Sequence, residues 1–250
     1  MTLRRFGMNP ALLTTIGRDA EGEELIGEAV RMGMICDYVY RSDDLPTDVY
    51  MAVEGANGLI AAIADAHSLE AAGDKILRAL ADGTLGSATA PFTGPVALDG
   101  NLTEELLQSI AASPLFTAAD LRVAPASPGK AERLLALVGH PSATLYVNLE
   151  EAGLLCQTTF GDSASAAAGL IERGVHRVLV TDGGKSASEG TAGDIITQTP
   201  PAVMVTRVTG AGDTFMAAHI ASEAQGMDRD AAMSRALNAA ATYVSGETPL

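Results

Sequence analysis

The chain has 250 residues, 47% of them hydrophobic, which is enough for one large α/β domain with a sizeable core. Its formal net charge of −15 argues against nucleic acids and anionic membranes as partners, because both require basic patches. No apolar run reaches the ~18 residues of a membrane span, and Met1 is not followed by a signal-peptide core, so we predict a cytoplasmic protein.

The first residues are typical of a helix end followed by a strand. Asn9-Pro10 marks a turn, and residues 11–16 form an apolar run of strand length that stops at Gly17. Residues 19–33 then show the period of an amphipathic helix. We expect its inward face to carry Leu25, Ala29 and Val30, and its solvated face to carry Glu21, Glu23, Glu24 and Glu28.

Two runs of alternating apolar residues, 47–53 and 59–64, are joined by a segment that contains Asn57-Gly58. This dipeptide is a strong signal for a tight hairpin turn. A hairpin with one apolar face suits a lid over a ligand or a contact with another copy of the chain, and an edge position in the main sheet is the alternative. We predict that residues 39–65 form a β-hairpin lid and that a homodimer forms through it.

From residue 69 onward, helical and strand-like segments alternate, which is typical of parallel βαβ units. Strands are expected at 95–98, 121–124, 143–147 and 177–180, and helices at 69–80, 103–112, 129–138 and 163–174. We therefore predict one α/β domain over residues 1–250. Its core would be a doubly wound, mostly parallel sheet flanked by helices, with the ligand crevice at the carboxyl ends of the strands.

Near the C-terminus, an apolar run at 202–205 predicts a strand that leads into a glycine turn and a helix at 214–224. Gly210 and Gly212 can take positive φ and let a ligand approach the main chain. The N–H groups of the first helical turn then face an anion, with the positive end of the helix dipole behind them. A carboxylate at this point, Asp213, repels an anion, which indicates a role in chemistry on a hydroxyl. The alternative is that Asp213 only caps the helix.

The sequence Gly-Ala-Gly-Asp at 210–213 resembles the signature of the PfkB, or ribokinase-like, family of sugar and nucleoside kinases. This resemblance implies that Gly210, Ala211 and Gly212 form an anion hole for the transferred phosphoryl group and that Asp213 is the catalytic base. It also implies a ribokinase-like fold with a small β lid over the sugar. The cofactors implied are ATP and Mg²⁺.

The element Asn148-Leu149-Glu150-Glu151 follows a predicted strand and resembles the Asn-x-x-Glu element of the same family. The resemblance places Asn148 and Glu151 in the network of Mg²⁺, water and phosphate. A hard dication in a phosphate site needs only one or two carboxylates, so Glu151 is a sensible Mg²⁺ ligand or anchor. The same tetrapeptide also fits an ordinary helix start, with Asn as the cap and Glu in the first turn.

Other segments resemble the nucleotide and sugar sides of the family's site. Residues 181–184 are similar to a nucleotide-binding segment, which assigns Thr181, Gly183 and Gly184 to ATP, although Ser186 stands where the family has its last glycine. Asn238 resembles a residue near the adenine. On the sugar side, the residues that resemble substrate-lining positions are Asn101 and Lys130.

Two departures from the family pattern affect these expectations. Many members carry Asp at the position of Arg207, near a monovalent-cation site, so the resemblance gives no support to potassium activation here. A preceding segment with a substrate-binding Asp and a Gly-Gly motif is not in the given sequence, either because this sequence starts late or is cut short, or because the protein has lost the segment. That segment normally contacts the substrate.

We therefore predict an ATP-dependent kinase that phosphorylates a hydroxyl of a small-molecule sugar or nucleoside. Within the family, residues 46–47, 62–65 and 99–102 look most like pseudouridine kinases. The alternative is a catalytically impaired ribokinase-like protein that binds a nucleotide or metabolite as a regulator, because the substrate-binding segment is missing. The retained Asp213 favours the enzyme.

Overall fold

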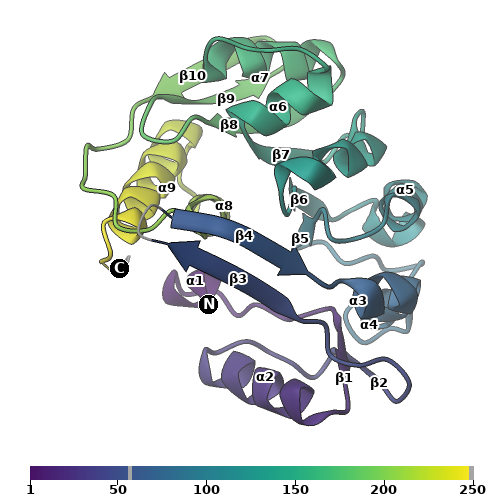
Figure 1. Cartoon of the computed structure of the whole chain (residues 1–250). Helices are drawn as coiled ribbons and strands as arrows, with labels where there is room; N and C mark the ends of the chain where they lie inside the picture. The colour runs from purple at the N-terminus through teal and green to yellow at the C-terminus, as the bar shows by residue number, and fades with distance from the viewer. Residues whose placement is uncertain (56–57, 248–250) are drawn as a thin grey trace.

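A six-stranded sheet forms the centre of the computed structural model, which describes residues 1–55 and 58–247 (Figure 1). Its strands are β5 (Pro95–Asp99), β6 (Asp120–Ala124), β7 (Ala143–Asn148), β8 (Arg177–Thr181), β9 (Ala187–Thr191) and β10 (Asp194–Gln198). They lie in the order β10-β9-β8-β7-β6-β5, with β5 to β8 parallel and β9 antiparallel to both of its neighbours. The predicted α/β class and mostly parallel sheet are confirmed, whereas the sequence pattern does not predict the antiparallel edge formed by β9 and β10.

Helices cover both faces of the six-stranded sheet (Figure 1). One face carries α5 (Glu104–Ala112), α6 (Leu149–Cys156), α7 (Ser163–Glu172) and the 3-10 helix η3 (Pro128–Leu137), and the other carries α8 (Ala211–Ala224), α9 (Arg229–Val244) and α1 (Thr2–Arg5). Alternation along the strands divides the apolar side chains between two cores. In β7, for example, Leu145 and Val147 join the core beneath α5 to α7, while Tyr146 joins the core beneath α8 and α9.

Some predicted helices differ from the observed ones. The helix expected at 69–80 is divided into α3 (His67–Ala72), the 3-10 helix η1 (Gly73–Leu77) and α4 (Arg78–Ala81). Gly73 takes a φ of +56°, which interrupts the α-helical path. The helix expected at 129–138 is the 3-10 helix η3, and a further 3-10 turn, η2 (Pro114–Phe116), follows α5. None of the helices in the described residues combines the length and the hydropathy that a bilayer span requires.

Two small sheets precede the main one in the sequence. β1 (Thr15–Gly17) and β2 (Tyr40–Ser42) form a parallel pair, and β3 (Tyr50–Gly55) and β4 (Gly58–Ala64) form an antiparallel hairpin. Within the described residues the hairpin pairs only with itself, so it stands apart from the main sheet, as Figure 1 shows. Asn57 of the expected turn lies outside the described residues. The strand expected at 11–16 is confined to β1, which an isolated bridge between Ala11 and Ile35 precedes.

The helix expected at 19–33 is α2 (Ala20–Arg31), and Asp19 caps it by accepting a hydrogen bond from the N–H of Gly22. Ala29 is buried as predicted, but the prediction that Leu25 and Val30 face inward is wrong, because they are 46% and 55% exposed. The neighbouring sheet has only two short strands, β1 and β2, and it is too small to cover the whole apolar side of α2.

Two carboxylates fix the base of the hairpin. Asp19 accepts hydrogen bonds from the hydroxyl and the N–H of Thr47, and these bonds lower the pKa of Asp19 to about 2. Asp48, which also precedes β3, accepts from the N–H groups of Ser68 and Leu69 at 2.8 and 2.9 Å. The hairpin is thereby tied at its base to the starts of α2 and α3.

Candidate functional site

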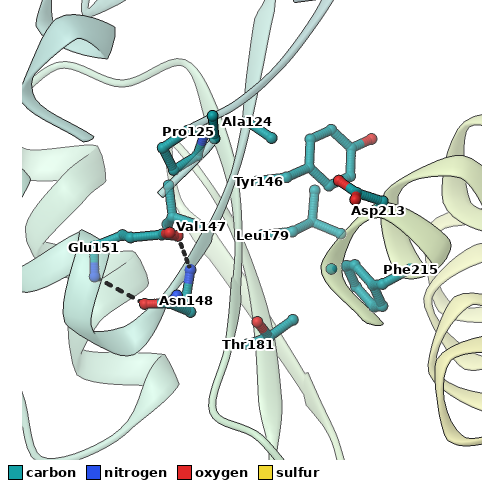
Figure 2. A pocket seen from close by; sticks show the side chains of 12 residues that line it. Ala124, Pro125, Tyr146, Val147, Asn148, Glu151, Leu179, Thr181, Asp213 and Phe215 are labelled. Carbon is teal, nitrogen blue, oxygen red and sulfur yellow. Dashed lines mark hydrogen bonds between the residues drawn. The ribbon is translucent and has the colours of Figure 1, made fainter. Parts of the chain in front are cut away.

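A cavity of about 180 Å³ lies at the carboxyl ends of β6, β7 and β8, between these strands and the start of α8 (Figure 2). Three neighbouring parallel strands therefore deliver side chains to one point, as expected for an open α/β sheet. The residues that line the cavity are Ala124, Pro125, Ala126, Tyr146, Val147, Asn148, Glu151, Leu179, Thr181, Gly212, Asp213 and Phe215.

The first turn of α8 is built to receive an anion. Gly210 is the N-cap in a left-handed conformation, with a φ of +89°, and no side chain of the described residues caps the helix. A Cβ on Gly212 would meet nothing within 4 Å, so the main chain there is open to the cavity. The N–H groups of a first helical turn have no partner within the helix, and the helix dipole adds positive potential. Together these features would suit an anion such as a phosphoryl group, and this first turn of α8 is called the anion cradle below.

Asp213 is the third residue of α8, and it lines the cavity together with Tyr146 (Figure 2). The alternative that it caps the helix is wrong, because Gly210 occupies the cap position and Asp213 makes no capping bond. Partial burial raises the pKa of the Asp213 carboxyl, and the negative charge of Asp99 raises it further. A carboxylate whose charge is disfavoured by its surroundings, and which solvent still reaches, is suited to accept a proton.

Asn148 and Glu151 lie across the cavity from Asp213 (Figure 2). The two form a capping box at the start of α6: Asn148 Oδ1 accepts from the N–H of Glu151 at 2.9 Å, and Glu151 Oε2 accepts from the N–H of Asn148 at 2.8 Å. The interpretation of this element as a helix start is thus confirmed. Burial raises the pKa of Glu151, so a nearby cation would stabilise its charged form.

The described residues contain no group of three or more Asp, Glu, His or Cys side chains that could hold a metal ion by themselves. Mg²⁺ bound to a nucleotide does not need such a cage, because it keeps several waters and takes one or two carboxylates together with phosphate oxygens. Glu151, with one carboxylate oxygen bonded to Asn148 and a position on the cavity wall, fits this smaller role.

A second, larger cavity of about 380 Å³ adjoins the first and shares Thr181, Gly212 and Phe215 with it. Gly183 and Gly184 of the loop after β8 form one side, and apolar residues of α9 form another. The third wall is residues 200–208, where the strand expected at 202–205 is not formed. Pro200 and Pro201 have no N–H to donate to a neighbouring strand, and Val203 and Val205 face the cavity instead. An apolar slot beside a phosphate cradle has the character of a nucleotide site.

Comparison with known proteins agrees with this geometry. Residues 1–248 match the profile of the pfkB family carbohydrate kinase. The chain belongs to the pfkB family. The predicted family is therefore confirmed, and with it the class of carbohydrate kinase. No curated protein sequence matches the chain.

Solved structures extend the comparison of this pfkB protein. A carbohydrate kinase from Agrobacterium tumefaciens is 25% identical, with a TM-score of 0.81 over 99% of this chain and 78% of that one. A ribokinase from Thermotoga maritima is 20% identical, with a TM-score of 0.77 over 98% and 77% of the two chains. Arabidopsis thaliana ribokinase complexed with ribose and ATP is 22% identical, with a TM-score of 0.74 over 97% and 78%. The fold is therefore ribokinase-like.

Asn238 of this pfkB kinase does not line either of the two cavities. Its side chain is exposed on α9 and donates a hydrogen bond back to the carbonyl of Ser234 at 2.8 Å. The neighbours Leu237, Ala240 and Ala241 line the larger cavity instead. Helical register thus turns Asn238 away from the slot, and its assignment to ATP stays a prediction.

Asp99 lines neither cavity, but its negative charge acts on Asp213, an influence that the motifs do not predict. It ends β5, and its carboxylate accepts from the N–H of Asn101 at 2.8 Å and from the side-chain amide of Asn101 at 3.0 Å. The ammonium of Lys130 in turn donates to the side-chain carbonyl of Asn101. The structure therefore joins the two predicted substrate residues, Asn101 and Lys130, to a carboxylate that acts on Asp213. The available signal was the position of an acidic residue directly after a predicted strand.

Proposed function

We propose that this pfkB kinase transfers the terminal phosphoryl group of ATP to a hydroxyl of an uncharged sugar or nucleoside. One observation carries the proposal. The uncapped first turn of α8 faces a cavity that Asp213 also lines, and the pKa of Asp213 is raised by burial and by the negative charge of Asp99. A phosphate cradle and a base at the same helical turn are the parts that phosphoryl transfer to an alcohol requires.

The donor nucleotide would occupy both cavities, with its base in the apolar slot and its phosphates at Gly210, Ala211 and Gly212. The two cavities meet at Gly212 and Thr181, so a single molecule can extend from one into the other. An E. coli protein solved in complex with ATP and Mg²⁺ has the same fold, at 18% identity and a TM-score of 0.77. Bound Mg²⁺ would neutralise phosphate charge. Glu151 and Asn148, which lie across the cavity from Asp213, would hold it through the Glu151 carboxylate and bound water.

Asp213 would accept the proton of the acceptor hydroxyl as that oxygen attacks phosphorus. A positioned general base contributes about 10²–10⁴ in rate, and a preorganised main-chain donor at the developing charge contributes about 10²–10³. Because the Asp213 carboxylate is partly desolvated, it is a stronger base than a fully solvated aspartate. Its place in the first turn keeps it next to the N–H groups that hold the transferred group.

The acceptor side favours an uncharged compound. Asp99 and Asp213 are both acidic, and Lys130 is engaged by Asn101. A sugar phosphate would therefore meet repulsion at the point where its hydroxyl must approach. The row formed by Asp99, Asn101 and Lys130 offers donors and acceptors for the hydroxyl or imide groups of a neutral substrate, and we propose pseudouridine as the first candidate from the likeness at 99–102.

A phosphotransfer assay with ATP and Mg²⁺ across pseudouridine, ribose, adenosine and fructose 6-phosphate tests this function. We expect turnover with at least one neutral acceptor and the lowest activity with fructose 6-phosphate. Tight ATP binding without turnover on any neutral acceptor would support the regulatory alternative and overturn the proposal.

We also propose a homodimer through the hairpin. Tyr50, Met51 and Ile63 are large apolar residues exposed on β3 and β4, and a second copy of the chain would cover them. Sedimentation of wild type should show a dimer, and Ile63→Glu should be monomeric. Leu25→Glu on α2, at another exposed apolar site, is the control that should remain dimeric. A monomeric wild type at micromolar concentration contradicts this assembly.

A further inference from the structure

The segment that leads into the Gly210 turn has no secondary structure of its own. Residues 203–209 are all exposed and belong to no helix or strand. They nevertheless deliver the chain to Gly210, whose φ of +89° sets the direction of the first turn of α8. The anion cradle therefore depends on whatever holds this exposed segment in place.

The tethers all run to the C-terminal end of α9. The N–H of Thr206 donates to the carbonyl of Val244 at 2.8 Å. The guanidinium of Arg207 donates to the carbonyl of Tyr243 at 2.8 Å and to that of Glu247 at 3.2 Å, and it stacks 3.9 Å from the centre of the Tyr243 ring. Arg207 thus combines three kinds of contact on one helix end: two hydrogen bonds, a cation over an aromatic face and a charge near helix carbonyls.

The end of α9 lacks a cation of its own. The last turn of the helix contains no basic residue, although its carbonyl groups carry the negative end of the helix dipole. Arg207 supplies the positive charge from the neighbouring segment.

The contacts of Arg207 with Tyr243 and Glu247 are called the Arg207 clamp below. Tyr243 links this clamp to the anion cradle at the start of α8. Its hydroxyl donates to the carbonyl of Thr209 at 2.8 Å, and a Cβ placed on Gly210 would lie 2.7 Å from the same hydroxyl. The phenol therefore contacts the turn directly. Arg207 fixes the ring of Tyr243, and Tyr243 fixes the turn.

We infer that Arg207 is a positioning residue for phosphoryl transfer: a fixed internal cation that, through Tyr243 and the end of α9, holds the Gly210 turn in the geometry that the anion cradle requires. This inference rests on the proposed function. Arg207 lines neither cavity, so it does not touch the nucleotide.

The test compares Arg207→Ala and Arg207→Lys with Arg235→Ala. Arg235 is the matched control, because its guanidinium also stacks on an aromatic ring, that of Phe6 at 5.0 Å, but away from the turn. We expect kcat of Arg207→Ala to fall by about tenfold to a hundredfold, as for a small misplacement of reacting groups, with the dissociation constant of ATP within about twofold of wild type. Arg207→Lys should recover part of the loss, and Arg235→Ala should retain wild-type kcat.

Guanidinium ion at concentrations well below denaturing should restore part of the activity of Arg207→Ala and leave wild type unchanged. Tyr243→Phe keeps the stacking but loses the bond to Thr209, and its effect should not add to that of Arg207→Ala, because the two act in series. Wild-type kcat in Arg207→Ala, or a reduced kcat with neither rescue by guanidinium nor non-additivity, would overturn the inference.

These outcomes are separable from failure of the proposed function. If wild type shows no turnover, the proposed function fails. The Arg207 clamp can then still be tested by measuring the rate of thermolysin cleavage within residues 203–209. Cleavage should be faster in Arg207→Ala than in wild type or Arg235→Ala. Equal cleavage rates in all three would overturn the clamp independently of activity.

Discussion

Near the C-terminal end of α8, Glu223 and its neighbour Glu189 on β9 lie among arginines, whereas at the N-terminal end the charge that acts on Asp213 is that of another carboxylate, Asp99. Both sites lie on the same helix and on the same face of the sheet. The pKa of Glu189 is lowered to about 2, while that of Asp213 is raised. The protein thus stabilises negative charge at the end that holds the fold together and leaves it unfavourable at the end where we propose that the chemistry takes place.

Long-range pairing produces the first of these environments. Glu189 is 0% exposed, and burial alone would raise its pKa, but His219, Arg177 and Arg229 overcome that cost. Arg177 and Arg229 each donate to Glu189 Oε1 at 2.8 Å. Glu223 continues the network by pairing with Arg177 and Arg122. Helix α8 is therefore ion-paired to strands β6 and β8, and Arg177 of β8 extends the network to Glu189 on β9.

The largest expected effect is at the cavity end of this comparison. Asp213→Asn keeps the shape of the side chain and removes the proton acceptor, so kcat should fall at least about a hundredfold. A raised pKa means that the ionised carboxyl opposes folding above its unfolded pKa, so the variant should be as stable as wild type or more stable at pH 7. Steady-state kinetics and thermal unfolding provide the two measurements.

ATP affinity should be unchanged or slightly higher in Asp213→Asn, because a like charge near the phosphates is gone. Glu105→Gln, which removes an exposed first-turn carboxylate from α5, is the control and should change neither kcat nor stability. A sharp loss of melting temperature with near wild-type kcat would show that Asp213 is structural and that the proposed mechanism is wrong.

Near the C-terminal end of α8, where the carboxylates are paired with arginines, we expect a loss of stability instead of a loss of kcat. Glu189→Gln leaves two arginines without their shared carboxylate, and removing one partner of a buried ion pair costs about 3–5 kcal/mol in the free energy of unfolding. Asp194→Asn removes a partner of the same Arg229, but its side chain is 60% exposed, so the cost should stay below about 1 kcal/mol. Denaturant titrations compare the two, and equal effects would contradict the distinction between paired and exposed charge.

In wild type, acid should remove the contribution of the Glu189 ion pairs to the free energy of unfolding. Because the folded-state pKa of Glu189 is depressed, its stabilisation is present above the ordinary value of 4.5 and is lost as pH falls from there through about 2. The unfolding free energy of wild type should therefore decline more steeply over that window than that of Glu189→Gln.

The smallest effect concerns the charge beside Asp213. Asp99→Asn removes a like charge, so the pKa of Asp213 should fall and the acidic limb of the kcat/KM profile should move to lower pH. Asp182→Asn, in the loop after β8, is the control, since its carboxylate is paired with Lys185. An acidic limb that does not move would mean that Asp213 does not set it.

Much of this fold could be predicted, because its information is local. The four parallel strands and the helix start at Thr103 follow from apolar runs and a capping residue, and Gly-Ala-Gly-Asp marks the start of α8. The edge strands β9 and β10 could not be read, since Ala187–Thr191 contains Ser188 and Glu189, polar residues whose burial depends on partners distant in the sequence.

The site shows the same limit. Motifs identify Asn148, Thr181 and Asp213, which line one cavity in the structure. They do not reveal that the charge of Asp99 acts on Asp213, because the two residues lie in β5 and α8, which are far apart in the sequence. The exposed faces of α2 and the unpaired segment at 202–205 also depend on the size of neighbouring elements, which periodicity does not encode.

The hairpin formed by β3 and β4 has a consequence for the rate of local opening. A two-stranded ribbon is marginally stable in water, and hairpins form in about 1–10 μs. Asp19 and Asp48 would keep its base attached to α2 and α3 if the strand pairing opened. Kinases turn over at about 1–100 per second, so an opening on the hairpin timescale would be fast compared with a catalytic cycle. Hydrogen exchange at the amides of β3 and β4 should accordingly be much faster than at those of β7, and the six-stranded sheet need not open for the hairpin to do so.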